Sequence, residues 1–205
     1  MDDWWRGCLE LLAPSRCVGC DELSRSVFCE ACAVLLERPA SPHAVYCYGG
    51  PIADAIHRYK YRGRSELARA LGGLMVEPAS RWSGRLDAVV PVPLHWRRRR
   101  WRGYDQAALL SKPVARALDV PLRVRGLRRV RHTPSQLDLP HHERQRNVAG
   151  AFVASKLRGA ERVLLIDDVR TTGATLGAAA AALRLAGVRE VHPLVLAARV
   201  LGEGT

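Results

Sequence analysis

The sequence predicts an α/β fold: a mostly parallel sheet with flanking helices, preceded by a small N-terminal module that carries four cysteines. Candidate strands and helices alternate through the second half of the chain, which is typical of a parallel sheet. Residues 162–166 form a largely apolar run of the kind found in strands buried on both faces. Two Cys-x-x-Cys motifs lie close together near the N-terminus and indicate a separate compact unit. A length of 205 residues fits one domain with a small appendage.

The N-terminal unit is expected to cover residues 1–38, as a short helix followed by the cysteine motifs. Two prolines within residues 38–42 then stop regular structure and indicate a linker. Residues 45–205 are expected to form the sheet domain.

The sheet domain is expected to begin with a short strand at residues 45–48 and a helix at residues 52–61, whose apolar side chains recur on one face. Ser65 is a plausible cap for a second helix, because leucines follow it at helical spacing. Pro113 is an awkward residue for the interior of a helix. The remaining elements are expected as strands at residues 87–92, 120–124, 162–166 and 191–196, and as helices at residues 104–118 and 176–186.

The chain is basic, with 32 Lys and Arg against 20 Asp and Glu and a net charge of +12. The excess lies in residues 49–160, which carry 23 basic and 8 acidic side chains, and it is densest at residues 97–100. Such a block attracts polyanions, either nucleic acid or a small molecule with a pyrophosphate group. Trp96 and Trp101 flank the block and suit stacking on single-stranded bases. The alternatives are a solvated arginine-rich surface and tryptophans packed beneath arginine side chains.

The four motif cysteines predict a structural zinc site, because a two-residue gap lets both thiolates of a motif reach one ion and two motifs complete a tetrahedron. The alternative is a pair of disulfides, which a reducing compartment disfavours. Cys8 and Cys47 are expected to be small apolar side chains rather than ligands. The expected zinc ligands are Cys17, Cys20, Cys29 and Cys32.

A cytoplasmic location is the default expectation. The most apolar stretch is broken by Arg184 and is far shorter than the roughly 18 residues of a membrane span, so no membrane insertion is expected. The acidic first residues show no secretory signal pattern.

The strongest functional signal follows residue 166, where a buried strand is expected to end in Asp167 and Asp168. A turn with three threonines and Gly173 comes next, and then a helix begins. Backbone N–H groups at a helix N-terminus favour a phosphate, whereas two carboxylates suit vicinal hydroxyls or a hydrated Mg²⁺. A phosphate beside a diol is a ribose 5-phosphate. The alternative is an ordinary strand-to-helix junction with a threonine cap.

This segment resembles the phosphoribosyl-pyrophosphate (PRPP) loop of type I phosphoribosyltransferases. The resemblance implies that Asp167 and Asp168 hold the ribose 2- and 3-hydroxyls and are the candidate catalytic residues. Arg170 stands where an apolar residue is usual in that family. The resemblance also implies that the 5-phosphate is held by the turn of Thr171, Thr172, Gly173, Ala174 and Thr175.

The resemblance extends over nearly the whole chain and narrows to the ComF (GntX-like) family. Beside the cysteine motifs, the matching segments are Tyr48-Gly49-Gly50-Pro51, residues 56–64, Val90-Pro91-Val92-Pro93-Leu94, Arg102-Gly103-Tyr104-Asp105-Gln106, Thr133-Pro134-Ser135-Gln136, Arg144, Asn147 and Gly150-Ala151-Phe152. The family resemblance implies a type I phosphoribosyltransferase-like sheet domain. It also implies a role in DNA uptake during natural transformation, beside a helicase-like partner.

The turn at residues 91–94 follows a strand at the same edge of the sheet as Asp167, so Pro93 is expected to lie in a pyrophosphate loop. Lys60, Arg62 and Arg102 are the basic candidates to face a pyrophosphate, or else exposed surface cations.

Three functions remain open. The first is a PRPP-binding accessory factor in DNA uptake, which is the favoured interpretation. The second is an active phosphoribosyltransferase that transfers the sugar to a nucleobase in salvage, with Mg²⁺ on the departing pyrophosphate. The third is a non-catalytic factor that binds single-stranded DNA through the basic segment.

Overall fold

The computed structural model describes residues 15–131 and 150–199. The helices are α2 (Glu30–Ala33), α3 (Gly50–Tyr61), α4 (Leu67–Gly73), α5 (Val76–Ala79), the 3₁₀-helix η1 (Ser80–Trp82), α6 (Trp96–Arg102), α7 (Gln106–Ala117) and α9 (Ala174–Leu185). The strands are β1 (Ala44–Cys47), β2 (Ala88–Pro91), β3 (Leu127–Arg129), β4 (Phe152–Ala154), β5 (Arg162–Arg170) and β6 (Glu190–Ala198). The helix expected before the cysteines lies outside the described residues, and so do residues 132–149.

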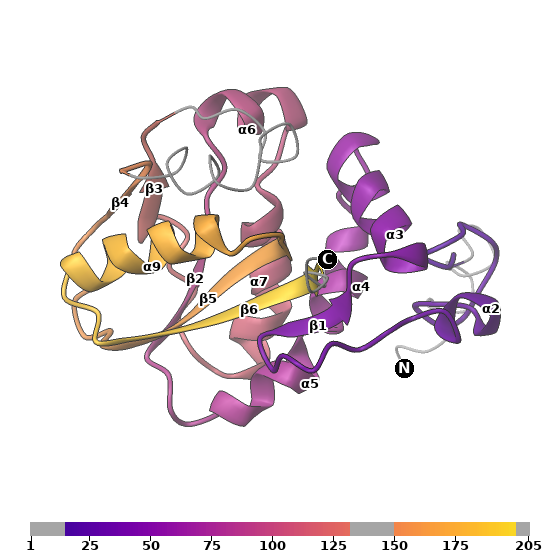
Figure 1. Cartoon of the computed structure of the whole chain (residues 1–205), viewed down its shortest axis with the longest axis horizontal. Helices are drawn as coiled ribbons and strands as arrows, with labels where there is room; N and C mark the ends of the chain where they lie inside the picture. The colour runs from indigo at the N-terminus through magenta and orange to yellow at the C-terminus, as the bar shows by residue number, and fades with distance from the viewer. Residues whose placement is uncertain (1–14, 132–149, 200–205) are drawn as a thin grey trace, which may run out of the picture.

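The main sheet contains four strands in the order β1-β6-β5-β2, and all three pairings are parallel. Helices cover it on both sides, with α9 on one face and α3, α4 and α7 on the other (Figure 1). The expected α/β fold with a mostly parallel sheet is therefore confirmed. Because the strands are parallel, the polar side chains that follow them gather at one edge of the sheet.

β5 is buried on both faces, as its apolar run predicts. Leu164 and Ile166 belong to the core beneath α3, α4 and α7, whereas Val163 and Leu165 belong to the core beneath α9. All four side chains are inaccessible to solvent. The burial of each contributes roughly 1.5–3 kcal/mol to the stability of the fold.

Two expectations about strands need correction. Residues 120–124 do not form a strand of their own: Leu122 makes an isolated parallel bridge with Val89 at the edge of β2. Pro121 has no N–H to donate, so the ladder cannot extend there. The antiparallel pair β3 and β4 was not expected, because its partners lie far apart in the chain and each strand has only three residues.

Helix α7 continues through Pro113 and packs closely against α4. A Cβ atom added to Gly72 of α4 would lie 2.7 Å from the carbonyl oxygen of Leu110 and 3.0 Å from Cγ of Pro113. The backbone of α7 cannot give way as a flexible side chain would. Gly72 is therefore required by this helix contact.

Gly72→Ala is expected to lower the free energy of unfolding by about 1–3 kcal/mol, because the new methyl group must push the two helices apart. Gly73→Ala is the matched control, since nothing lies within 4 Å of a Cβ at that position. That variant should be neutral or slightly stabilising, because alanine favours a helix over glycine. Urea unfolding of both variants checks the prediction, and equal effects would contradict it.

The segment that contains the four motif cysteines, residues 17–32, is here called the cysteine module. It packs beside α3 at one end of the molecule (Figure 1). Asp21 of the module forms ion pairs with Arg58 of α3 at 3.4 Å and with Arg64 just beyond α3 at 3.3 Å. Phe28 makes an edge-to-face contact with Tyr46 of β1, with ring centroids 6.2 Å apart. The module is thus attached to the sheet domain by both charge and apolar packing.

Across residues 15–131 and 150–199, every helix is too short or too polar to cross a lipid bilayer.

Candidate functional site

The two acidic residues of β5 lie at the open carboxyl edge of the sheet. β2 ends at Pro91, opposite Ile166, so the edge of β5 is uncovered beyond that point. β5 itself continues to Arg170, because its pairing with β6 extends that far. The strand therefore runs four residues past the expected range of 162–166, and Asp167 and Asp168 lie within it, as expected, but two residues before its end.

These acids face a cavity of about 230 Å³, here called the sugar-edge cavity. It lies between the end of β5, helix α3 and the segment that runs from the 91–94 turn into α7. Of the residues predicted from sequence, it is lined by Lys60, Pro93, Arg102, Asp167, Asp168, Thr171 and Thr175. Residues from three distant parts of the sequence thus meet at one site.

Arg62 is the predicted cation that does not line this cavity. It is exposed beyond the end of α3, where its backbone N–H donates to the carbonyl of Arg58. Thr172, Gly173 and Ala174 belong to the adjoining turn, and the first two line a separate hollow on the side facing the 38–41 segment.

Lys60 and Asp168 form the central ion pair of the cavity. The Nζ atom of Lys60 lies 2.8 Å from Oδ1 of Asp168, and the two side chains are only 18% and 11% exposed. A short, poorly hydrated pair of this kind depends on both partners, because either charge alone would be costly to bury. Lys60 therefore neutralises the carboxylate while no ligand is present.

Asp167 is a carboxyl group in an unfavourable place for a negative charge. Burial raises its pKa to about 8, the neighbouring Asp168 carboxylate adds to the rise, and Lys60 opposes it. One oxygen accepts a hydrogen bond from the N–H of Asp168 at 2.8 Å. Near neutral pH this carboxyl can therefore both donate to and accept from a hydroxyl.

The raised pKa of Asp167 has a consequence for stability. The folded protein keeps a proton on this carboxyl up to about pH 8, whereas the unfolded chain loses it near 3.8, so stability falls as the pH rises between these values. Asp167→Asn keeps the accepting oxygen and removes the charge. We expect Asp167→Asn to raise the free energy of unfolding by about 1–3 kcal/mol at pH 8.5 and hardly at all at pH 4. The gain is limited because the Asp167 side chain is partly exposed. Urea unfolding at both pH values checks this, and a gain of equal size at each would contradict it.

The turn after β5 allows a ligand to approach its backbone closely. Gly173 has φ +82°, a left-handed conformation that favours glycine, and it is the N-cap of α9. The N–H of Ala174 lies 3.4 Å from Oγ1 of Thr172. Helix α9 has twelve residues, and its N-terminus directs backbone N–H groups and the positive end of its dipole toward this turn. The turn can therefore accommodate an anion.

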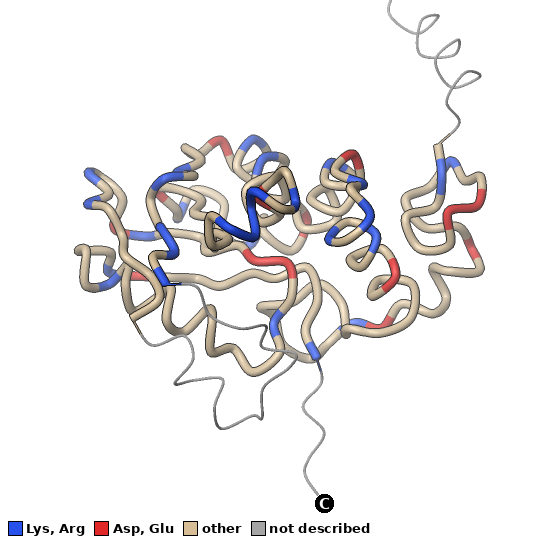
Figure 2. The backbone as a smooth tube through the Cα atoms, turned by 90° about the horizontal axis from the view of Figure 1, so that it is seen from above, with Lys and Arg blue, Asp and Glu red and all other residues tan. Residues whose placement is uncertain are grey.

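Positive charge surrounds the acids. Seen from above, basic segments crowd around a short acidic segment near the middle of the molecule (Figure 2). The basic residues that line the sugar-edge cavity are Lys60, Arg98, Arg102, Arg129 and Arg199. Burial, aided by Arg98, lowers the pKa of Arg129, and Asp167 opposes this effect.

Arg102 is held by two aromatic rings at the mouth of the cavity. Its guanidinium lies 5.1 Å from the ring centroid of Tyr61 and 6.0 Å from that of Trp101. Cation–π contacts of this length fix the position of a long side chain that would otherwise be mobile. Three further residues that line the cavity, Arg98, Arg129 and Gln106, were not predicted from the sequence. The run of arginines at residues 97–100 indicated a basic cluster that includes Arg98. Arg129, in contrast, lies on β3, a strand that was not expected.

The cysteine module brings the sulfur atoms of Cys17, Cys20, Cys29 and Cys32 within 4.8 Å of one another. The sulfurs of Cys20 and Cys29 are 3.7 Å apart, close to the separation of about 3.8 Å expected for two thiolates on one tetrahedral zinc ion. No disulfide joins the cysteines within the described part of the chain, all of which are free thiols. Four soft donors in a compact tetrad could hold a metal ion such as zinc.

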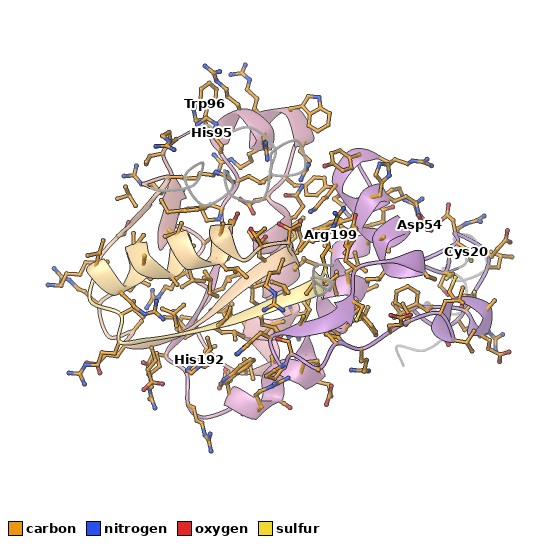
Figure 3. The ribbon with its side chains drawn as sticks, in the orientation of Figure 1. Cys20, Asp54, His95, Trp96, His192 and Arg199 are labelled. Atoms are coloured by element: carbon orange, nitrogen blue, oxygen red, sulfur yellow. The ribbon has the colours of Figure 1, made fainter. Side chains whose placement is uncertain are left out.

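The thiols of the module differ in acidity: burial and the neighbouring thiols raise the pKa of Cys32, whereas the pKa of Cys17 is lowered. Burial raises the pKa of Cys17, but the backbone N–H groups of Cys29, Cys20 and Gly19 outweigh it and lower that pKa to about 6. The N–H of Cys29 lies 3.3 Å from the sulfur of Cys17. Cys20 lies at the end of the molecule farthest from α9 (Figure 3), so this centre is separate from the sugar-edge cavity. Cys47 is half-buried at the end of β1 and is not part of the tetrad.

Comparison with known proteins decides the family. The model of the phosphoribosyl transferase domain matches residues 105–203. Competence protein F of Haemophilus influenzae is 32% identical over 211 aligned positions, which cover 91% of this chain and 92% of that protein. The chain belongs to the ComF family. The resemblance stated from the sequence motifs is thereby confirmed.

Other relatives of this ComF protein are similar over less of their length. DNA utilization protein YhgH of Escherichia coli is 36% identical over 151 residues, 71% of this chain and 66% of that protein. Competence protein ComFC of Bacillus subtilis is 29% identical over 143 residues, 68% of this chain and 56% of that protein. Among solved structures, glutamine PRPP amidotransferase from B. subtilis, complexed with ADP and GMP, matches with a TM-score of 0.44 and 25% identity, covering 68% of this chain and 30% of that one.

Proposed function

We propose that this ComF protein binds PRPP with Mg²⁺ in the sugar-edge cavity and serves as an accessory factor in DNA uptake. One observation carries the proposal: two adjacent carboxyl groups, two threonines of the turn before α9 and five basic side chains line the same cavity. A sugar with a diol, a phosphate and a diphosphate matches each of these features. The match to the phosphoribosyl transferase domain supports the same ligand.

The acids are suited to the ribose ring. Asp167 and Asp168 stand side by side and accept hydrogen bonds from the 2- and 3-hydroxyls, while the raised pKa of Asp167 reduces repulsion between them. The 5-phosphate enters the turn of Thr171 to Thr175, where N–H groups of the α9 N-terminus donate to it.

The diphosphate then faces the basic side of the cavity. Lys60 and Arg102 neutralise it, and the 91–94 turn with Pro93 borders it. Mg²⁺, when bound, would share the negative charge of the diphosphate; the carboxylates and phosphate oxygens here are the hard ligands it prefers. Arg62 takes no part in this arrangement because it lies outside the cavity.

The role in DNA uptake rests on the relatives. Two of them are named as competence proteins and one as a DNA utilization protein, and each aligns with at least 68% of this chain. A PRPP site in such a protein can serve as a sensor of nucleotide supply or can transfer the sugar. A helicase-like partner and a cytoplasmic location complete the proposal.

Calorimetric titration of the protein with PRPP and Mg²⁺ tests the ligand. Saturable binding with one site is expected, and weaker binding of ribose 5-phosphate, since it lacks the diphosphate. The absence of heat with PRPP, at protein concentrations that detect millimolar dissociation constants, would overturn the proposal. Release of pyrophosphate across a panel of nucleobases decides between a sensor and an active transferase.

A second candidate function, binding of single-stranded DNA, is favoured by helix α6. Trp96 and Trp101 are 56% and 71% exposed, and the arginines between them cover the same short helix. Trp96 lies at the outer tip of the molecule (Figure 3). Exposed rings among cations match the stacking and charge that single strands require.

Filter binding of an oligothymidylate over a range of salt concentrations tests this second function. Trp101→Ala is expected to weaken binding about tenfold, within the range of one lost stacking contact. Arg184→Ala on the exposed side of α9 is the control for simple loss of charge and should change little. Affinity that does not depend on salt would contradict an electrostatic site.

A further inference from the structure

Gln106 is a buried polar residue with an unused donor. It is 1% exposed, and its side-chain amide nitrogen has no hydrogen-bond partner among residues 15–131 and 150–199. The same residue lines the sugar-edge cavity. A buried amide donor without a partner is costly for the fold, and native proteins keep such groups chiefly where a ligand or water completes them.

The backbone around Gln106 is fixed from two sides, so its position in the cavity is determined. The hydroxyl of Tyr59 on α3 donates to the carbonyl of Gln106 at 3.0 Å, and the hydroxyl of Tyr104 donates to the carbonyl of Tyr59. Asp105 caps α7 with one oxygen and accepts from the N–H of Leu94 at 3.0 Å with the other. The start of α7 is thereby fastened both to α3 and to the 91–94 turn.

The stereochemistry of ribose places Gln106 relative to the proposed ligand. The 2- and 3-hydroxyls are carried by C2 and C3, which lie between C1 and C4 in the ring. A ribose held at these two hydroxyls therefore directs its C1 and C5 substituents to opposite sides. With the 5-phosphate in the 171–175 turn, the C1 substituent points away from that turn. Gln106 lines the cavity directly after Asp105, which accepts a hydrogen bond from Leu94 of the 91–94 turn, the turn proposed to border the diphosphate.

We infer that the Gln106 amide donates a hydrogen bond to the C1 diphosphate and makes the site select PRPP over ribose 5-phosphate. The inference rests on the proposed function and assigns a residue to ligand recognition within it. Arg102 supports the assignment, because its Nε atom is also buried without a partner in the described part of the chain and lines the same cavity. Two unused donors in one cavity match an acceptor-rich group such as a diphosphate.

Lys60 is the cation that neutralises negative charge in the sugar-edge cavity. In the ligand-free protein its ammonium group neutralises Asp168. When the ribose hydroxyls take the oxygens of Asp168, the ammonium group turns to the diphosphate, whose charge replaces that of the carboxylate. Gln106 donates without adding charge, so its contribution depends on the presence of the acceptor and not on long-range attraction.

Calorimetry with PRPP and with ribose 5-phosphate, each with Mg²⁺, tests the inference on the wild-type protein and on Gln106→Met. Methionine keeps the length and removes the donor. We expect PRPP affinity to fall about tenfold, the value of one hydrogen bond to a charged group, while ribose 5-phosphate affinity stays unchanged. The ligand-free variant should melt at a higher temperature, because an unpaired buried donor has gone.

Ser111→Ala is the matched control on the same helix. The Ser111 hydroxyl is buried but already donates to the carbonyl of Ala107 at 2.6 Å. Its loss should lower the melting temperature and leave the ratio of the two affinities unchanged. Equal losses of both affinities in Gln106→Met, no loss in either, or a lower melting temperature would overturn the inference while leaving PRPP binding intact. A wild-type protein that binds neither ligand would overturn the proposed function and this inference with it.

Discussion

Replacement of both Asp167 and Asp168 by asparagine is expected to lower the affinity for PRPP at least about 100-fold. A hydrogen bond from a ribose hydroxyl contributes about 1.5–3 kcal/mol at the charged Asp168 and about 0.5–1.5 kcal/mol at the protonated Asp167, and the two together account for the loss. The double variant also carries an amide beside Lys60, whose charge then has no neutralising partner there. Calorimetric titration with PRPP and Mg²⁺ measures the effect, and thermal unfolding shows that the variant remains folded.

Asp87→Asn is the matched control for the double variant. Like Asp168, Asp87 forms an ion pair, with Arg162 at 3.2 Å, but it does so at the opposite end of β5 from the cavity. Its replacement should lower stability and leave PRPP affinity within about twofold of the wild-type value, since sites that share no partner act independently. If the double variant bound PRPP as tightly as Asp87→Asn does, the assignment of the two acids would be wrong.

Loss of one cysteine from the tetrad is expected to release the metal and to lower the melting temperature by more than about 10 °C. In Cys17→Ser the site keeps three sulfurs, and a hydroxyl is a poor ligand for zinc at neutral pH. Structural zinc supplies folding free energy directly, because the ligands come together only in the folded module. Elemental analysis should give one zinc per wild-type chain and nearly none for the variant.

Cys47→Ser is the control for this experiment. The Cys47 thiol lies outside the tetrad, so its replacement should leave one zinc per chain and change the melting temperature by only a few degrees. A wild-type protein purified without chelators that contained no zinc, or a Cys17→Ser variant that kept its zinc, would contradict the metal centre.

The sequence was informative wherever the chemistry is local. The two cysteine motifs and the run from Asp167 to Thr175 each lie in one short segment, so their spacing alone indicated what they could bind. The alternation of apolar strands and helices was likewise enough to predict a parallel sheet. Such signals do not depend on how distant segments pack.

The parts that could not be predicted depend on tertiary contacts. β5 extends to Arg170 because β6 continues beside it, which no local pattern announces. The pairing of Lys60 with Asp168 joins residues more than one hundred positions apart. Gln106 belongs to a family-like sequence motif. Only the folded structure shows that its buried amide nitrogen has no hydrogen-bond partner among the described residues. The expected strand at residues 120–124 failed because Pro121 removes a ladder donor.

Helix α3 serves two centres at once. Asp21 of the cysteine module pairs with Arg58, and two positions further along the same helix Lys60 contacts Asp168 in the cavity. Because both residues belong to one helix, a shift of α3 on the side of the cysteine module would also move Lys60. If the cysteine module holds zinc and the cavity holds PRPP as proposed, loss of the metal is expected to weaken PRPP binding through α3, although the two sites lie apart.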